Sequence, residues 1–252
     1  MHHRLLEISR DLEAARQDVL AGYDPLRLYN FRVATRRIRS ILKQMDGHAE
    51  KGMRKAWGGL TAVTGRARDW DVFLATAEQL LTRERFAEFS AINRERIDSS
   101  REGVCEMLAS APFMRHLQDW NAFLENAREQ AADPGQAEIA LERAIEVARH
   151  RFRLARIDEN DRNWHRYRIA IKEMRYVAEA NPQLEDAAEL AEDCKPLQDL
   201  LGDWHDTVVQ LGMLKGLPKE PVHAELNALI HQRQEGLLKR IRNSPPPRRG
   251  AD

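Results

Sequence analysis

Basic side chains recur at three- and four-residue spacing near the start of the chain. On a helix of about 100° per residue they fall within about 60° of one another. We call this set the first stripe: Arg32, Arg36, Arg39 and Lys43. Like charges at this spacing destabilise a helix by about 0.2–0.5 kcal/mol per pair. A helix with this stripe is stabilised by an anion that neutralises it, so these residues predict an anion-binding surface.

The same arrangement occurs again 136 residues further along the chain. The second stripe consists of Arg168, Lys172 and Arg175. His165 precedes it by one turn, at the position that Tyr29 holds before the first stripe, and Glu179 stands where Lys43 would be. A following motif repeats at an offset of 137, pairing Leu60, Asp69 and Val72 with Leu197, Asp206 and Val209. An unfavourable charge pattern that is present twice indicates a common ligand.

Two structural interpretations of the stripes stay open beside this one. A charged helix face is commonly a solvated face, and the stripes could pair with the nine carboxylates of residues 179–206. Solvated faces usually mix both signs, because opposite charges four residues apart stabilise a helix. The segment from Arg27 to Lys43 instead holds six Lys or Arg residues and no Asp or Glu.

The residue types favour a chain of phosphates as the anion. Arginine outnumbers lysine by five to two in the two stripes, and its planar fork matches phosphate oxygens bidentately. The first stripe covers about 16 Å at about 1.5 Å per residue, which suits a polymer better than one phosphate group. Reading of bases would require amide or stacking side chains, and the stripes have few beyond Asn30, Tyr29 and Tyr176.

The composition as a whole excludes several classes of protein. The chain has 252 residues with 40 Lys+Arg and 40 Asp+Glu, 42% apolar and 32% charged residues, which excludes a disordered polyelectrolyte. No 18-residue apolar run and no secretion signal occur. Cys105 and Cys194 are 89 residues apart without any CxxC motif, so a disulfide framework is not expected. We therefore expect a cytoplasmic protein.

The elements that position the stripes are predicted to be helices. Apolar residues recur every three or four positions throughout, which indicates an all-α chain of about ten helices. On the helix of the first stripe, the apolar set opposite the cations is Phe31, Ala34, Ile38, Ile41, Leu42 and Met45. The five tryptophans, Trp57, Trp70, Trp120, Trp164 and Trp204, lie at similar apolar positions and are predicted to be core. Pro134 and Gly135 mark a break, which predicts two helical repeats over 1–132 and 133–244 and a disordered tail over 245–252.

Four motifs in this order resemble the CHAD domain, a histidine-containing α-helical domain. They are residues 32–40 (RVATRRIRS), 65–72 (GRARDWDV), 165–176 (HRYRIAIKEMRY) and 197–206 (LQDLLGDWHD). The resemblance covers nearly the whole chain. It implies two pseudo-symmetric four-helix-bundle-like repeats around a central basic groove that binds inorganic polyphosphate, in association with polyphosphate granules or polyphosphate-metabolising proteins.

Carried over by the resemblance, the polyphosphate-binding residues are Arg32, Arg36, Arg39, Lys43, His165, Arg168, Lys172 and Arg175. Tyr29 departs from the family, which has a histidine there. The triphosphatase domain that often accompanies this family is not expected, because the chain has no ExExK motif. The resemblance therefore indicates a binding module alone.

Other chemistry finds little support in the sequence. His165, His205 and Asp206 lack the spacing of metal ligands, so we expect no metal and no cofactor. Asp69 and Asp71 could act as paired carboxylates, but a structural role is favoured. In that role Gly65 ends one helix and Asp69 caps the next, an arrangement that Gly202 and Asp206 repeat.

The sequence thus predicts a non-catalytic polyphosphate-binding protein. The alternative is a helical module that binds the phosphate backbone of nucleic acids through the same stripes. An enzyme is disfavoured because neither a P-loop nor a GxSxG motif is present.

Overall fold

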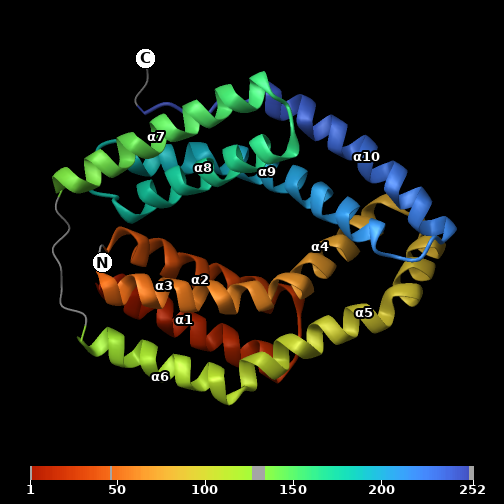
Figure 1. Cartoon of the computed structure of the whole chain (residues 1–252), viewed down its shortest axis with the longest axis horizontal. Coiled ribbons are helices and arrows are strands. Elements are labelled where there is room, and N and C mark those ends of the chain that lie inside the picture. The colour runs from red at the N-terminus through yellow and green to blue at the C-terminus, as the bar shows by residue number, and fades with distance from the viewer. Residues whose placement is uncertain (1, 46, 127–133, 250–252) are drawn as a thin grey trace. The chain divides into compact units, whose positions relative to one another are not determined.

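The computed structural model describes residues 2–45, 47–126 and 134–249, and these ranges contain ten helices and no strand (Figure 1). The all-α prediction is therefore confirmed. The chain divides into two compact units, residues 1–131 and 132–252, which we call the first and the second unit and describe separately. The predicted break at 131–135 falls mostly on residues outside the described ranges, and α7 begins at Pro134, where proline at a first helical position is favourable. No helix of the described ranges is long and apolar enough to cross a membrane.

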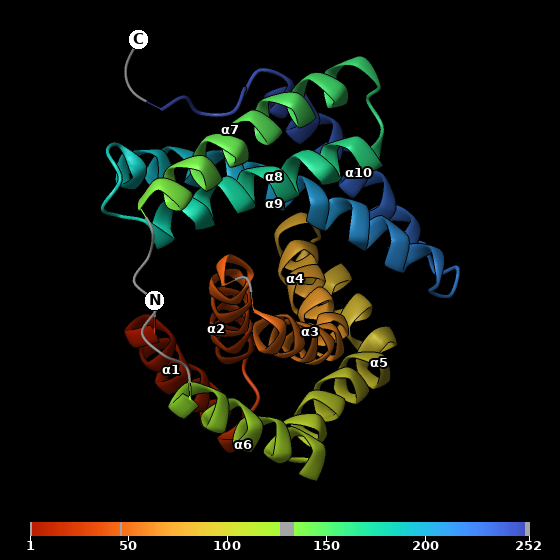
Figure 2. The ribbon, with the colours of Figure 1, turned by 60° about the vertical axis from the view of Figure 1, so that its left-hand side comes forward.

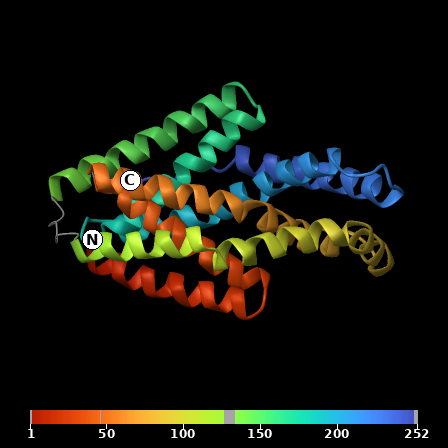
Figure 3. The same cartoon turned by 60° about the horizontal axis from the view of Figure 1, so that its bottom comes forward.

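The first unit contains six described helices. They are α1 (His2–Ala21), α2 (Pro25–Gln44), α3 (His48–Val63), α4 (Gly65–Leu80), α5 (Arg83–Ala109) and α6 (Ala111–Asn126). Helix α2 begins where the Asp24 carboxylate accepts from the backbone N–H groups of Leu26 and Arg27, a typical N-cap. It packs against α1 and α3, and α1 also lies beside α6 (Figures 1 and 3).

The apolar face predicted for α2 forms part of the core of this unit. Phe31 and Ile38 are fully buried, and all six predicted positions are buried. The Phe31 ring contacts that of Phe113 from α6, and Trp57 of α3 meets Trp120 of α6 edge to face, with ring centroids 5.7 Å apart. The cations of the first stripe therefore lie on the opposite side of α2.

The second unit contains four described helices. They are α7 (Pro134–Ile157), α8 (Asp161–Ala180), α9 (Ala187–Lys215) and α10 (Pro221–Arg242). Helix α8 packs between α7 and α9, and α10 packs on α9 (Figure 2). Trp164, Tyr167 and Trp204 are buried in its core. Together with the first unit, all five tryptophans are at most 3% exposed, so their predicted core role is confirmed.

The stripe helices correspond residue by residue in their limits. Helix α2 spans 25–44 and α8 spans 161–180, so both ends differ by the offset of 136 found in the sequence. The first unit differs in having α6 after its fifth helix. The first unit also has two helices, α3 and α4, where the second unit has the single helix α9.

The helix division in the first unit occurs at Thr64, and it corrects the predicted capping roles. Thr64 ends α3 and Gly65 opens α4, so Asp69 lies inside α4 instead of capping it. In the second unit, Gly202 and Asp206 both lie inside α9. A single glycine costs a helix only about 1 kcal/mol, which buried neighbours such as Leu201 offset.

The C-terminal segment makes contacts with the second unit. Residues 244–249 form no helix, yet the Tyr167 hydroxyl donates to the Ser244 carbonyl at 3.2 Å and Pro246 is buried. Arg249 pairs with Glu138 of α7 and donates to the Glu185 carbonyl at 2.9 Å. The predicted disordered tail over 245–252 thus includes residues held against the unit, and 250–252 lie outside the described residues.

Candidate anion-binding site

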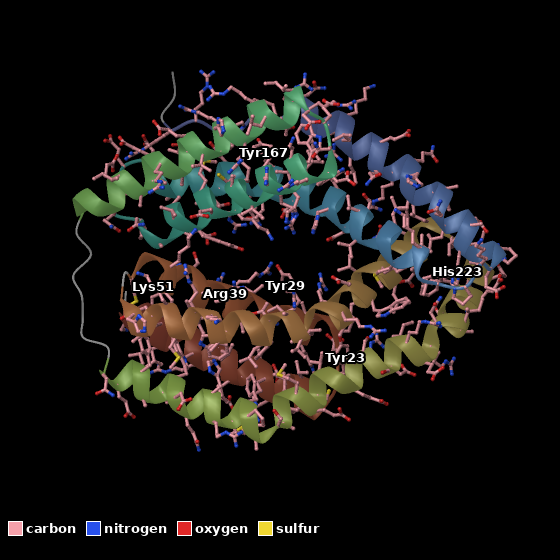
Figure 4. The ribbon with its side chains drawn as sticks, in the orientation of Figure 1. Tyr23, Tyr29, Arg39, Lys51, Tyr167 and His223 are labelled. Carbon is pink, nitrogen blue, oxygen red and sulfur yellow. The ribbon has the colours of Figure 1, made fainter. Side chains whose placement is uncertain are left out.

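The first stripe lies on one side of α2, as predicted. Arg32, Arg36 and Arg39 are half-buried and Lys43 is exposed. Figure 4 labels Arg39 together with Tyr29, which belongs to the preceding turns of the same helix. Most of the stripe therefore has guanidinium groups partly shielded from water, where a charge interacts more strongly with an anion than it does in bulk solvent.

Arg32 also forms hydrogen bonds with the residues at the junction of α3 and α4. Its Nη1 donates to the Thr61 carbonyl at 2.9 Å and to the Thr64 hydroxyl at 2.6 Å. The Thr61 carbonyl belongs to the last turn of α3, whose carbonyls lack helical partners. Burial, with Arg36 and Arg68 nearby, lowers the pKa of Arg32, whereas Asp69 acts in the opposite direction. Arg32 thus has a structural role in addition to any ligand that it binds.

Arg39 lies against a glycine of the neighbouring helix. A Cβ atom at Gly58 of α3 would lie 3.5 Å from the Arg39 guanidinium, which is ordinary van der Waals contact, so Arg39 packs along this part of α3. Arg39 Nε is buried without a hydrogen-bond partner in the described ranges. Such an orphaned donor is costly, so part of the Arg39 guanidinium is desolvated.

A fifth cation joins the first stripe from α4. The Arg68 guanidinium lies over the Tyr29 ring, 5.2 Å from its centroid, a cation–π arrangement. Tyr29 itself is 41% exposed. Burial raises the pKa of Asp69, and Arg32 and Arg68 oppose this rise. Arg68 belongs to neither predicted stripe, because its contact with Tyr29 depends on how α4 packs on α2.

The second stripe lies on α8 but is partly neutralised within its own helix. Arg168, Lys172 and Arg175 are half-buried. Arg175 forms an ion pair with Glu179 at 2.7 Å, the residue that replaces Lys43 in the repeat. The second stripe is therefore less positive than the first.

Two histidines meet at the start of the second stripe. The rings of His165 on α8 and His205 on α9 have centroids 4.6 Å apart, and their Nδ1 atoms are 3.4 Å apart. Burial, followed by Arg168, lowers the pKa of His165 and lowers that of His205 to about 4. No group of three or more potential His, Cys, Asp or Glu metal ligands occurs in the described ranges, so Asp206 does not complete a metal site with these two.

The second aspartate of the RDWD motif is a structural residue. The Asp71 side chain is fully buried and accepts from the Tyr23 hydroxyl at 2.7 Å and from Arg101 at 3.1 Å. The Arg101 guanidinium also lies over the Tyr23 ring. Burial and the bond to Asp71 raise the pKa of Tyr23 far above its ordinary value, so it stays a hydrogen-bond donor. This group joins α4 and α5 to the turn before α2.

Comparison with known proteins agrees with this all-helical architecture. The family model of the CHAD domain matches residues 3–215, and the chain therefore belongs to the CHAD domain family. A crystal structure of the CHAD domain from the plant Ricinus communis has the same fold, with a TM-score of 0.73. The two are 23% identical, over 96% of this chain and 85% of that one. No curated protein matches the sequence.

Proposed function

We propose that this protein binds inorganic polyphosphate through the two stripes and does no chemistry on it. The observation that carries the proposal is the presence of cations at three- and four-residue spacing on one side of α2 and again on α8. Membership of the CHAD domain family supports it, because proteins of this family are linked to polyphosphate. Polyphosphate presents a regular row of charges, which matches regularly spaced guanidinium groups.

The side chains around the stripes support a binding role more than a catalytic one. Asp71 is occupied by Tyr23 and Arg101. Burial raises the pKa of the Cys194 thiol to about 12, whereas a reactive cysteine needs a lowered pKa. We extend the proposal to a cytoplasmic location, in association with polyphosphate granules or polyphosphate-metabolising proteins.

The test is a binding assay with polyphosphate of defined lengths, run against single-stranded RNA and orthophosphate. The variant Arg36→Gln, Lys43→Gln, Arg168→Gln, Lys172→Gln removes four cations, two from each stripe, and should lower polyphosphate affinity at least a hundredfold. Arg32 is left in place because it binds Thr61 and Thr64. The matched control removes four exposed cations elsewhere, Arg94, Arg115, Lys239 and Arg240, and should change affinity less than threefold.

Salt dependence provides a second measurement. Seven Lys and Arg contacts predict a slope of log K against log salt near −5, at about 0.7 per contact, and near −4 if Arg175 stays paired with Glu179. A salt-independent affinity contradicts electrostatic binding. Displacement of polyphosphate by RNA at equal phosphate concentration would favour the nucleic-acid alternative. Orthophosphate release that disappears in Arg36→Ala would establish an enzyme.

A further inference from the structure

Each unit has a pair of contacting side chains at corresponding positions of the repeat. Tyr29 and His165 are related by the 136 offset, since 29 + 136 = 165, and Arg68 and His205 by the 137 offset, since 68 + 137 = 205. In both units the two side chains are in contact, with Arg68 over Tyr29 and the His205 ring on His165. The residue one turn before each stripe thus meets a residue from a following helix.

The two pairs differ in their charge. Arg68 is cationic at every physiological pH, and Tyr29 is uncharged. The imidazoles of His165 and His205 are neutral at pH 7, because both have lowered pKa values. With Nδ1 atoms 3.4 Å apart, a neutral pair has one Nδ1–H that donates to the other Nδ1. One added proton turns this pair into a cation at the place where the first unit has Arg68.

We propose that Arg68 and His205 are anion-binding residues beyond the two stripes, and that the His165–His205 pair binds a phosphate group together with one proton. This inference rests on the proposed binding of polyphosphate. In the first unit the charge of Arg68 is always present. In the second unit the His165–His205 pair becomes charged when the phosphate binds.

The charges around the pair explain why a ligand would bring the proton. Burial is the largest cause of the lowered pKa of both rings, and Arg168 and Lys172 on α8 lower both values further by repelling a proton. Each protonated ring would also repel a proton from the other. On α9, the carboxylates Asp203 and Asp206 lie two residues before and one residue after His205 in the sequence. A phosphate oxygen bound at Arg168 and Lys172 would cancel this repulsion. Phosphate binding and protonation then strengthen each other, as linkage requires.

The expected size of the effect follows from one proton. If a bound phosphate returns one imidazole to an ordinary pKa near 6.5, polyphosphate should bind about tenfold more tightly at pH 5.5 than at pH 8. The sign is positive toward acid, because the complex holds more protons than the free protein.

The experiment is isothermal titration of the full chain with polyphosphate of defined length at pH 6, in two buffers of different ionisation enthalpy, which measures proton uptake. Terminal phosphates of the ligand also titrate, so the readout is the difference from a variant. His165→Tyr with His205→Arg installs the pair of the first unit, so its affinity should no longer rise toward acid, and at pH 6 it should take up about three quarters of a proton fewer than the wild type. His116→Gln on α6, another histidine with a lowered pKa, is the matched control and should take up as many protons as the wild type.

Two single variants keep the test sharp if the double variant folds poorly. His205→Gln should lose the gain in affinity toward acid, so it should bind about fivefold more weakly than the wild type at pH 5.5 and show a smaller difference at pH 8. Arg68→Gln should weaken binding by a similar factor at both pH values. Polyphosphate binding with equal proton uptake in wild type and double variant overturns this inference and leaves the proposed function standing. No polyphosphate binding at any pH overturns both.

Discussion

The first and second units carry the same stripe on helices of the same length, but they hold it in different ways. At an offset of 137, the polar Thr64 corresponds to the buried Leu201, and the buried Asp71 corresponds to Val208, which packs against the apolar core. The first unit positions its stripe with hydrogen bonds and ion pairs between helices. In the second unit the two corresponding positions lie on one continuous helix, α9, and pack in or against the apolar core.

This difference separates the features that a common ligand would require from those that only position the stripe helices. Both units keep three cations at matching positions and a buried apolar face beneath them. The groups around the stripe differ freely in charge, as with Lys43 and Glu179 or Arg68 and His205. Four predictions test this comparison.

The largest effect is expected at Asp71. Asp71→Ala leaves Arg101 and the Tyr23 hydroxyl without their partner, and breaking a buried pair costs about 3–5 kcal/mol. Val208→Ala at the corresponding position should cost about 1 kcal/mol, a typical value for a single substitution. Urea unfolding followed by circular dichroism measures both. Equal losses would contradict the distinction between polar and apolar support.

The next effect separates two neighbours within the first stripe. Arg32→Ala removes the donors to Thr61 and Thr64 and should lower the free energy of unfolding by about 1–3 kcal/mol. Arg36→Ala removes the same charge but only a 3.3 Å bond to the Arg32 carbonyl of its own helix. It should change the stability by less than about 0.5 kcal/mol. Thermal unfolding of the two variants decides whether the stripe has this internal division.

A smaller effect concerns the exchange of Lys43 and Glu179 between the stripes. Glu179→Lys releases Arg175 from its ion pair and should strengthen polyphosphate binding about fivefold, since partly exposed pairs contribute about 1 kcal/mol or less. Lys43→Glu should weaken it by a similar factor. The salt slope should steepen by about 0.7 to 1.4 in the first variant. An unchanged slope would mean that the end of the second stripe does not contact the ligand.

The smallest effect is on stability against acid. His116 and His205 have lowered pKa values when folded, so the unfolded chain takes up protons first as the pH falls below about 6.5. Each contribution to stability is therefore fully present above that pH and is lost as the pH falls through the lowered pKa of the folded protein, which is about 4 for His205. His205→Gln and His116→Gln should each reduce the loss of unfolding free energy between pH 7 and pH 4.5, as measured by urea unfolding at the two pH values. The reduction is under about 1 kcal/mol for each variant, because both rings are partly solvated.

Much of the fold was predictable from helical periodicity. The buried positions of α2, the core tryptophans and the helical class were read correctly because each depends on spacing within one segment. The capping roles of Asp69 and Asp206 were wrong. Glycine predicts a helix end at both Gly65 and Gly202. A helix does end at Thr64, beside Gly65, whereas burial of the leucines around Gly202 keeps α9 intact.

The candidate site was only partly predictable for a related reason. The stripes themselves follow from sequence spacing. The contacts of Arg68 with Tyr29 and of His205 with His165 join residues about 40 positions apart, and they depend on which faces of two helices meet. The offsets of 136 and 137 already paired these residues across the repeat, but only the packing shows that each pair is in contact.

The ion pair between Arg249 and Glu138 has a consequence for the topology of the second unit. It places Arg249 beside the beginning of α7. A domain tolerates new termini where the two segments to be joined lie close together. A short linker from Arg249 to Pro134, with the chain opened in the turn after Lys215, would give a permuted second unit with the same helix contacts.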